Sequence, residues 1–189
     1  MKIECSAEKF KNALSKIERI AVKNGTLPIL SSFLLTTEKD MLKICSTNLS
    51  IGVEIKISAK IFNNGVLAVE ADLLSGVINS IPKNETIYIE ENKGNLSIKT
   101  RNSSILIKTY PIDDFPSLPK IEEENVFLSN TNDVLNGLRA VFYSAPSSDI
   151  KPEFSSVFIY SDGDNLVFVS TDSFRLAEKK IKTKKQLNI

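Results

Sequence analysis

The feature that most constrains this chain is an internal repeat at a fixed spacing of 124 residues. The matched positions include Leu14 and Leu138, Pro28 and Pro152, Ser46-Thr47 and Ser170-Thr171, and Glu54 and Glu178. The register holds without a gap over about 55 positions, which unrelated sequences rarely achieve. The repeat therefore predicts a duplicated structural unit.

Hydrophobic patterning divides the chain into three copies of a β-α-β-β-β pattern. In the first copy, Phe10, Leu14 and Ile17 recur at helical spacing after Ser6, a typical N-cap residue. Runs rich in Ile, Leu, Val and Thr between polar turns predict the strands. The predicted elements are strand 2–5, helix 7–22 and strands 30–37, 41–47 and 52–60; strand 66–69, helix 71–81 and strands 86–91, 96–101 and 104–109; and a strand around 126–129, a helix capped by Thr131 or Asn132 and strands 154–160, 165–171 and 174–181.

The copies suggest one complete domain followed by half of another. Two copies, residues 1–60 and 65–110, are expected to form a first domain over residues 1–120, which includes the start of a proline-rich linker. Residues 121–189 hold a single copy, so its helix face and a strand edge lack the partner that a second copy would supply. We therefore expect either a fragment or a chain that borrows the missing half from another molecule.

Composition argues against catalysis. The chain has no histidine and no glycine-rich phosphate loop, which removes histidine bases, histidine-ligated metals and common nucleotide sites. Cys5 and Cys45 lie in strand-like runs and are expected to be small buried residues. We predict no metal site, no cofactor and no enzymatic activity.

The expected compartment is the cytoplasm. No apolar run approaches the length of about 18 residues that a membrane span needs. The N-terminus also lacks the long apolar stretch of a secretory signal.

Basic residues gather on one face of the first predicted helix. Net charge is only +1, so any contact with nucleic acid must come from a local patch. At about 100° per residue, Lys9, Lys16, Arg19 and Lys23 fall opposite the apolar face. These residues form either an ordinary solvated face or a stripe that faces a polyanion.

Four motifs carry a resemblance to a known family. They are Thr26-Leu27-Pro28-Ile29-Leu30, Ser46-Thr47-Asn48-Leu49, Asp114-Phe115-Pro116 and Thr171-Asp172-Ser173-Phe174-Arg175-Leu176-Ala177. In this order and spacing the chain resembles the N-terminal half of the bacterial DNA polymerase III beta subunit, the replicative sliding clamp. The resemblance implies an α+β DNA-clamp fold in which helices line a hole and sheets form the outer wall. It also implies a homodimer that closes into a ring around duplex DNA.

The resemblance implies a processivity factor without catalytic activity. Such a clamp encircles duplex DNA without sequence preference and tethers the polymerase to it. Its protein partners are the catalytic subunit of DNA polymerase III, the clamp loader and repair polymerases, which bind through a short linear motif. An alternative is a stand-alone, truncated clamp-like protein that acts as a peptide-binding or inhibitory module and does not encircle DNA.

The resemblance also implies three groups of site residues. Candidate DNA contacts are Lys9, Lys16, Arg19, Lys23 and Asn24, with Arg139 and Lys151 as weaker candidates. One wall of the partner-peptide pocket comprises Phe154, Thr171, Ser173, Phe174, Arg175 and Leu176. The family pattern there is Thr-Asp-Gly-His-Arg-Leu, so Ser173 and Phe174 imply a bulkier, more apolar floor. The dimer contact would use the strand at 104–109, with Ile105 and Ile107.

Overall fold

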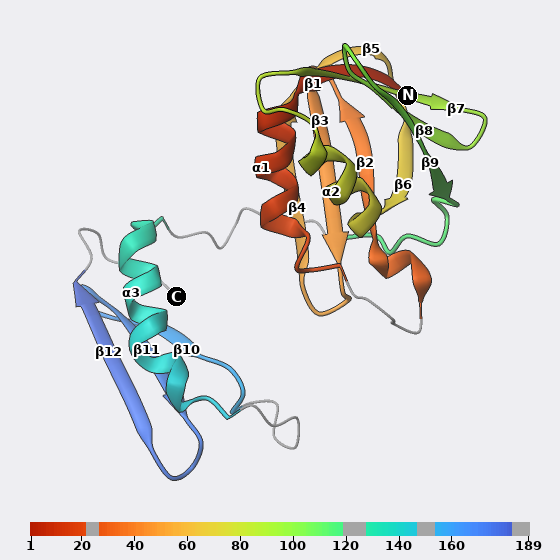
Figure 1. The fold of residues 1–189 in the computed structure, drawn as a ribbon. Helices are drawn as coiled ribbons and strands as arrows, with labels where there is room; N and C mark the ends of the chain where they lie inside the picture. Colours follow the sequence, from red (N-terminus) through yellow and green to blue (C-terminus); the bar gives the residue numbers. More distant parts are fainter. Residues whose placement is uncertain (22–26, 119–127, 147–153, 183–189) are drawn as a thin grey trace. The chain divides into compact units, whose positions relative to one another are not determined.

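The computed structural model describes residues 1–21, 27–118, 128–146 and 154–182 (Figure 1). The chain divides into two compact units, Met1–Pro119 and Lys120–Ile189, called here the first and second unit. The first unit contains β1 (Lys2–Ser6), α1 (Ala7–Ile17), the 3-10 turn η1 (Pro28–Ser31), β2 (Ser32–Glu38), β3 (Met41–Thr47), β4 (Gly52–Ser58), β5 (Lys60–Asn63), β6 (Val66–Glu70), α2 (Ala71–Ser80), β7 (Thr86–Asn92), β8 (Asn95–Lys99) and β9 (Ser104–Tyr110). The second unit contains α3 (Thr131–Val141), the 3-10 turn η3 (Phe142–Ser144), β10 (Phe158–Asp162), β11 (Asn165–Thr171) and β12 (Leu176–Lys182).

The sheet of the first unit interlocks its two β-α-β-β-β copies. Nine strands run in the order β4-β3-β2-β6-β9-β8-β7-β1-β5. The opening strand of the first copy, β1, pairs with β7 of the second copy, and the opening strand of the second copy, β6, pairs with β2 of the first. Each copy thus needs the other to complete its sheet.

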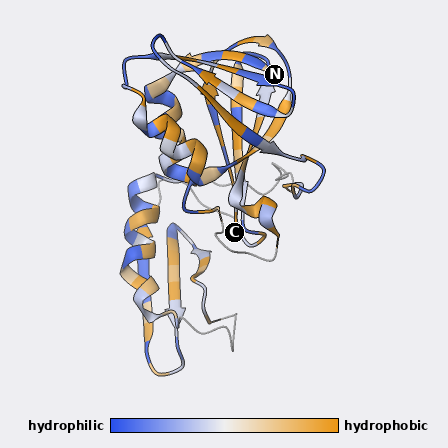
Figure 2. Cartoon of the chain, turned by 45° about the vertical axis from the view of Figure 1, so that its right-hand side comes forward, coloured by the Kyte–Doolittle hydropathy of each residue, from blue (hydrophilic) through white to orange (hydrophobic). Residues whose placement is uncertain are grey.

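The core of the first unit lies between the sheet and the apolar faces of α1 and α2. Phe10, Leu14 and Ile17 of α1 and Leu74 and Ile78 of α2 are fully buried. Hydrophobic and hydrophilic residues alternate along several strands, which places one set against the helices (Figure 2). Burying these side chains is the main stabilising contribution, about 1.5–3 kcal/mol for each large one.

The second unit reproduces the first copy at the spacing of 124 residues. The bounds of α3, β11 and β12 each lie 124 positions after those of α1, β3 and β4. The strand register agrees, because Leu34 pairs with Cys45 as Phe158 pairs with Val169. The repeat seen in the sequence is therefore a repeat of structure, and the predicted α+β class is confirmed.

Several predicted bounds were wrong. Helix α1 ends at Ile17 and continues as a turn to Ile20, whereas the sequence predicted a helix to residue 22, which lies outside the described residues. The predicted strand 52–60 is two strands, because the chain leaves β4 after Ser58 and begins β5 at Lys60. β10 and β12 begin later than predicted, since turns occupy residues 154–156 and 172–174.

The predicted strand before α3 was also wrong where the structure can test it. Residues 128–130 form no strand, and residues 126 and 127 lie outside the described residues. In the first unit the opening strands β1 and β6 each pair with a strand of the other copy. The second unit has one copy, so a strand before α3 has no such partner there.

Charged side chains of alternating sign cover part of β2, β3 and β4. Lys43 lies 2.7 Å from Glu38 and 3.5 Å from Glu54, and Lys56 lies 3.0 Å from Glu38 and 3.4 Å from Glu54. Hydrogen bonds from Lys43 and Lys56 lower the pKa of Glu38. These pairs mark a solvated surface of the sheet.

Among the described helices, none is long and apolar enough to cross a membrane.

Candidate functional site

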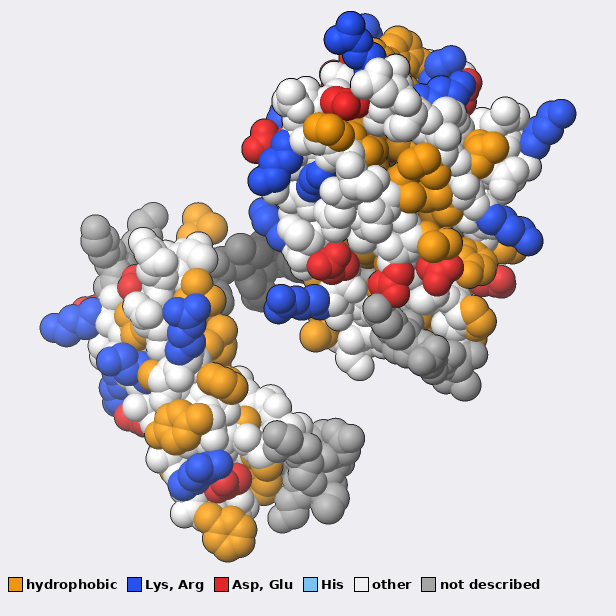
Figure 3. Space-filling model, viewed as in Figure 1, with side chains coloured by type: hydrophobic (Ala, Val, Ile, Leu, Met, Phe, Trp, Pro, Cys, Tyr) orange, Lys and Arg blue, Asp and Glu red, His pale blue; other side chains and the backbone are white. Residues whose placement is uncertain are grey.

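The outward face of α1 carries exposed basic side chains. Lys9 and Lys16 lie on the helix, and Arg19 lies in the turn that follows it. Within the described residues, no ion pair joins these three side chains to a carboxylate, although Glu8 and Glu18 are exposed nearby. Figure 3 shows basic side chains along the α1 side of the first unit. Three exposed cations along one helix and its following turn can contact phosphates without reading bases.

Lys11 has a different role from its neighbours on α1. Its Nζ donates to the backbone oxygen of Asn79 at 3.0 Å and to that of Ile81. These carbonyls lie at the C-terminal end of α2, where a cation is favourable. Lys11 therefore ties the two helices together and is not available for a ligand.

The remaining candidate DNA contacts are sparse. Lys23, Asn24 and Lys151 lie outside the described residues. Arg139 is exposed on α3, but the counterparts of Lys9 and Lys16 at the spacing of 124 are Asp133 and Ala140. The basic stripe is thus a property of α1 and is not repeated on α3.

The predicted peptide wall is built on a compact turn between β11 and β12. Asp172 Oδ1 accepts the backbone N–H groups of Phe174 at 3.1 Å and Arg175 at 2.9 Å. Thr171 Oγ1 accepts the N–H of Ser173 at 3.2 Å and donates to the carbonyl of Arg175 at 2.8 Å. Ser173 has a φ of 75°, a left-handed conformation that favours glycine.

The charge of Asp172 is stabilised by this turn. The backbone hydrogen bond from Arg175 is the main cause that lowers the pKa of Asp172, and the N–H of Phe174 and the Arg175 guanidinium add to it. Arg175 Nε donates to Asp172 Oδ2 at 2.9 Å. Asp172 is not among the predicted pocket residues, although the repeated Ser-Thr-Asx triplets at 46–48 and 170–172 could have revealed its role.

Apolar and aromatic side chains project around the turn. Phe174 is 98% exposed and Leu176 is 67% exposed. The guanidinium of Arg175 lies 5.9 Å from the ring centre of Tyr143, which the sequence analysis did not select. Phe154 is half-buried. Exposed apolar side chains beside a hydrogen-bonded turn are suited to contact the anchors of a short peptide.

Strand β9 offers a partly open backbone edge. It pairs with β8 from Ser104 to Lys108, whereas its pairing with β6 is confined to Thr109 and Tyr110. Ile107 is buried in the core and Ile105 is half-buried, so neither presents a fully exposed side chain. Leu106, which the sequence analysis did not select, is 66% exposed. An interface on this edge would therefore involve backbone groups, the side chain of Leu106 and the half-buried Ile105, whereas Ile107 could contribute only its backbone.

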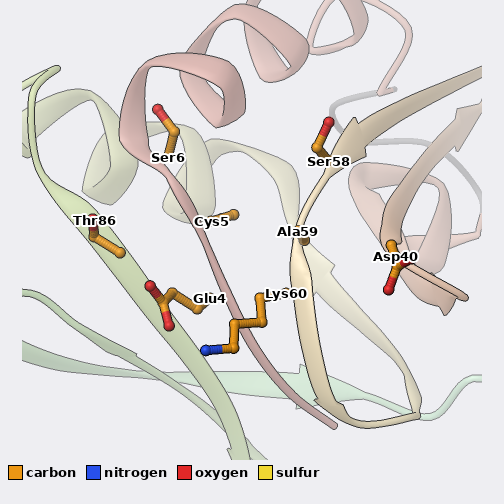
Figure 4. A pocket seen from close by; sticks show the side chains of 8 residues that line it. All are labelled: Glu4, Cys5, Ser6, Asp40, Ser58, Ala59, Lys60 and Thr86. Atoms are coloured by element: carbon orange, nitrogen blue, oxygen red, sulfur yellow. The ribbon is translucent and has the colours of Figure 1, made fainter.

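A pocket lies between β1, β5 and β7. Its eight lining residues are Glu4, Cys5, Ser6, Asp40, Ser58, Ala59, Lys60 and Thr86 (Figure 4). Burial, with a smaller effect of Glu4, raises the pKa of the Cys5 thiol to about 12, so it stays protonated at neutral pH. Burial also raises the pKa of Cys45 to about 11. Within the described ranges, no group of three or more Cys, Asp or Glu could hold a metal ion.

Comparison with known proteins identifies the family. The sequence model described as "DNA polymerase III beta subunit, N-terminal domain" matches residues 1–119. The chain belongs to the DNA polymerase III beta subunit family. The "Beta sliding clamp" of Synechocystis sp. is 26% identical over 185 residues, a match that covers 94% of this chain and 47% of that protein. The chain spans about half the length of the curated relatives it matches.

Solved structures of beta subunits share the fold. The DNA polymerase III subunit beta of Pseudomonas aeruginosa has a TM-score of 0.91 and 22% identity, covering 100% of this chain and 51% of that chain. The DnaN sliding clamp of Bartonella birtlesii bound to griselimycin has a TM-score of 0.89 and 21% identity, covering 98% of this chain and 51% of that one. Both likenesses support the clamp fold for the described elements.

Proposed function

We propose that this chain is the N-terminal half of a DNA sliding clamp, a non-catalytic subunit that tethers the replicative polymerase to duplex DNA. The family match over residues 1–119 carries the proposal. Residues 1–120 would form the first clamp domain, and residues 121–189 would form half of the second. The repeat at 124 residues supports this division, because the second unit has the fold of one copy. A homodimeric ring would then require residues beyond these 189.

DNA would be contacted weakly and without base recognition. Lys9, Lys16 and Arg19 on the α1 side are the best supported contacts, because they are exposed and make no ion pair within the described residues. Lys23, Asn24, Arg139 and Lys151 remain further candidates. Each neutralised phosphate adds salt-dependent affinity, so few cations suit a protein that must slide.

Partner proteins would dock at the turn between β11 and β12. The catalytic subunit of DNA polymerase III, the clamp loader and repair polymerases would each place a short linear motif against the wall formed by Phe154, Thr171, Ser173, Phe174, Arg175 and Leu176. The exposed side chains of Phe174 and Leu176 support this role, since apolar anchors supply most of the affinity in such contacts. The edge of β9, with Ile105 and Ile107, is proposed as the contact between protomers.

The DNA part of the proposal can be tested on this chain directly. Binding of the 189-residue chain to a short duplex, measured by fluorescence anisotropy at several salt concentrations, should be weak and should fall steeply as salt rises. Binding that does not depend on salt would contradict a phosphate contact. Firm binding of a polymerase-derived linear motif without any DNA binding would instead favour the stand-alone peptide-binding module.

A further inference from the structure

The first unit contains the same turn as the proposed peptide wall. Between β3 and β4, Asn48 Oδ1 accepts the N–H groups of Ser50 at 3.1 Å and Ile51 at 2.8 Å. Thr47 Oγ1 accepts the N–H of Leu49 at 3.1 Å and donates to the carbonyl of Ile51 at 3.0 Å. Leu49 has a φ of 74°, close to the value of Ser173. Every hydrogen bond that the side chains of Thr171 and Asp172 make with backbone groups of the turn is thus present 124 residues earlier.

The chain itself covers the surface beside this first turn. The side chain of Leu118 lies over Gly52, where an added Cβ would come within 2.5 Å of Leu118 Cδ2. Phe115 packs against the buried cluster of Ile29, Leu30 and Ala68. Both anchors belong to residues 112–118, which follow β9 within the first unit.

The covered positions correspond to proposed peptide-binding positions. Gly52 is the counterpart of Leu176, and Leu30 is the counterpart of Phe154, at the spacing of 124 residues. In the second unit Leu176 is 67% exposed, whereas its counterpart in the first unit has Leu118 above it. Glycine at position 52 leaves the space that Leu118 occupies.

The covering segment, residues 112–118, lies on the first unit without forming a helix or a strand, as a short bound peptide can. The N–H of Phe115 donates to the carbonyl of Ile112 at 3.0 Å, and residues 116–118 are in neither helix nor strand. Phe115 and Leu118 are half-buried, while Ile112 remains 43% exposed. Pro116 restricts the backbone between the two anchors, which lowers the entropy lost when the segment is held in place.

We propose that the first unit contains a second peptide-binding groove, which residues 112–118 of the same chain keep closed as an intramolecular ligand. Phe115 and Leu118 are its two anchors. If this segment is displaced, the groove accepts an extended peptide with an aromatic and an aliphatic anchor three positions apart. The inference that residues 112–118 close the groove is drawn from contacts within the first unit. Only the class of ligand, a short peptide, rests on the proposed function.

A binding experiment tests the groove. The chain carries Phe174→Ala and Leu176→Ala throughout, so that the second unit cannot contribute. In this background, adding Phe115→Ala and Leu118→Ala should raise affinity for a fluorescent peptide with the sequence of residues 111–119 by at least tenfold. The matched control Ile112→Ala should leave the affinity for this peptide unchanged. A control peptide with alanine in place of its Phe and Leu should show no gain in affinity when Phe115 and Leu118 of the chain are replaced. A folded variant that binds no more tightly than the control would overturn the proposal, whatever the second unit does.

A second variant tests the closure without altering the segment. Gly52→Leu places a side chain where Leu118 lies, so a protease that cuts on the N-terminal side of aspartate should cleave the segment at Asp113 at least tenfold faster than in the unaltered chain. Gly76→Leu is the control, because no atom lies within 4 Å of a Cβ at that position. Equal cleavage rates in the Gly52 and Gly76 variants would contradict a segment held over Gly52.

Discussion

Asp172 and Asn48 hold the same position in two copies of one turn and differ in charge. Both side-chain oxygens accept two backbone N–H groups, so an amide suffices for the local structure. Only the carboxylate can also form the ion pair with Arg175, at 2.9 Å. The charge at residue 172 therefore fixes the orientation of Arg175, one residue of the proposed peptide wall.

The Asp172→Asn variant should keep the turn and lose its pH dependence. The pKa of Asp172 is lowered in the folded chain, so its stabilising contribution is present above the unfolded value of about 3.9. That contribution is lost as the pH falls through the lower folded pKa. Thermal unfolding of the second unit, measured from pH 7 down to pH 2, should show this loss in the unaltered chain and less of it in the variant. Identical pH profiles would contradict the assignment.

Gly137 on α3 and Phe168 on β11 form a packing contact whose side chains differ from those at the equivalent positions of the first unit. A Cβ at Gly137 would lie within 2.4 Å of the Phe168 ring, whereas the counterparts in the first unit are Ala13 and Ile44. Glycine on the helix thus accompanies phenylalanine on the strand in the second unit, whereas the larger alanine accompanies the smaller isoleucine in the first unit. Close packing makes such a pair interdependent.

This dependence predicts a non-additive pair of substitutions. Gly137→Ala should destabilise the second unit by about 1–3 kcal/mol through overpacking, despite the better helix propensity of alanine. Adding Phe168→Ile, which recreates the first-unit pair, should recover at least about 1 kcal/mol relative to the sum of the single changes. Chemical denaturation measures all three. Gly76→Ala in α2 is the control and should be neutral or stabilising, and additive effects at 137 and 168 would refute the coupling.

The elements differ in how well the sequence predicted them. Helices α1 and α3 were found because Phe10, Leu14 and Ile17, and their counterparts, repeat at helical spacing. The start of β12 was misplaced because hydrogen bonds of Asp172 hold Phe174 and Arg175 in a turn, which apolar patterning does not reveal. The role of Leu118 was missed as well, because its contact with Gly52 joins residues far apart in the sequence.

The exposed basic residues on the α1 side, Lys9, Lys16 and Arg19, lead to a prediction for DNA binding. Replacing Lys9, Lys16 and Arg19 together by glutamine should weaken duplex binding and reduce the salt slope of the affinity by roughly 2–3, about 0.9 for each phosphate that is no longer neutralised. Anisotropy titrations at several salt concentrations measure the slope. Lys93→Gln, in the turn between β7 and β8, should leave it unchanged. An unaltered slope in the triple variant would remove α1 from the DNA interface.

At the scale of the whole molecule, the net charge of +1 fits retention by enclosure better than retention by attraction. A protein that must move along DNA gains nothing from many phosphate contacts, whereas a closed ring holds without them. The chain spans about half the length of its curated relatives. The 189 residues alone are therefore expected not to remain on circular DNA.

Retention on circular DNA tests the clamp proposal most directly. The protein isolated from its own cells, together with whatever residues or subunits complete its ring, should be loaded onto a nicked circular plasmid, washed at high salt and separated by gel filtration before and after the plasmid is cut. We predict that it co-elutes with the circle at high salt and is released when the DNA is linearised. Loss from the circle at high salt, or equal retention on linear DNA, would contradict an encircling clamp.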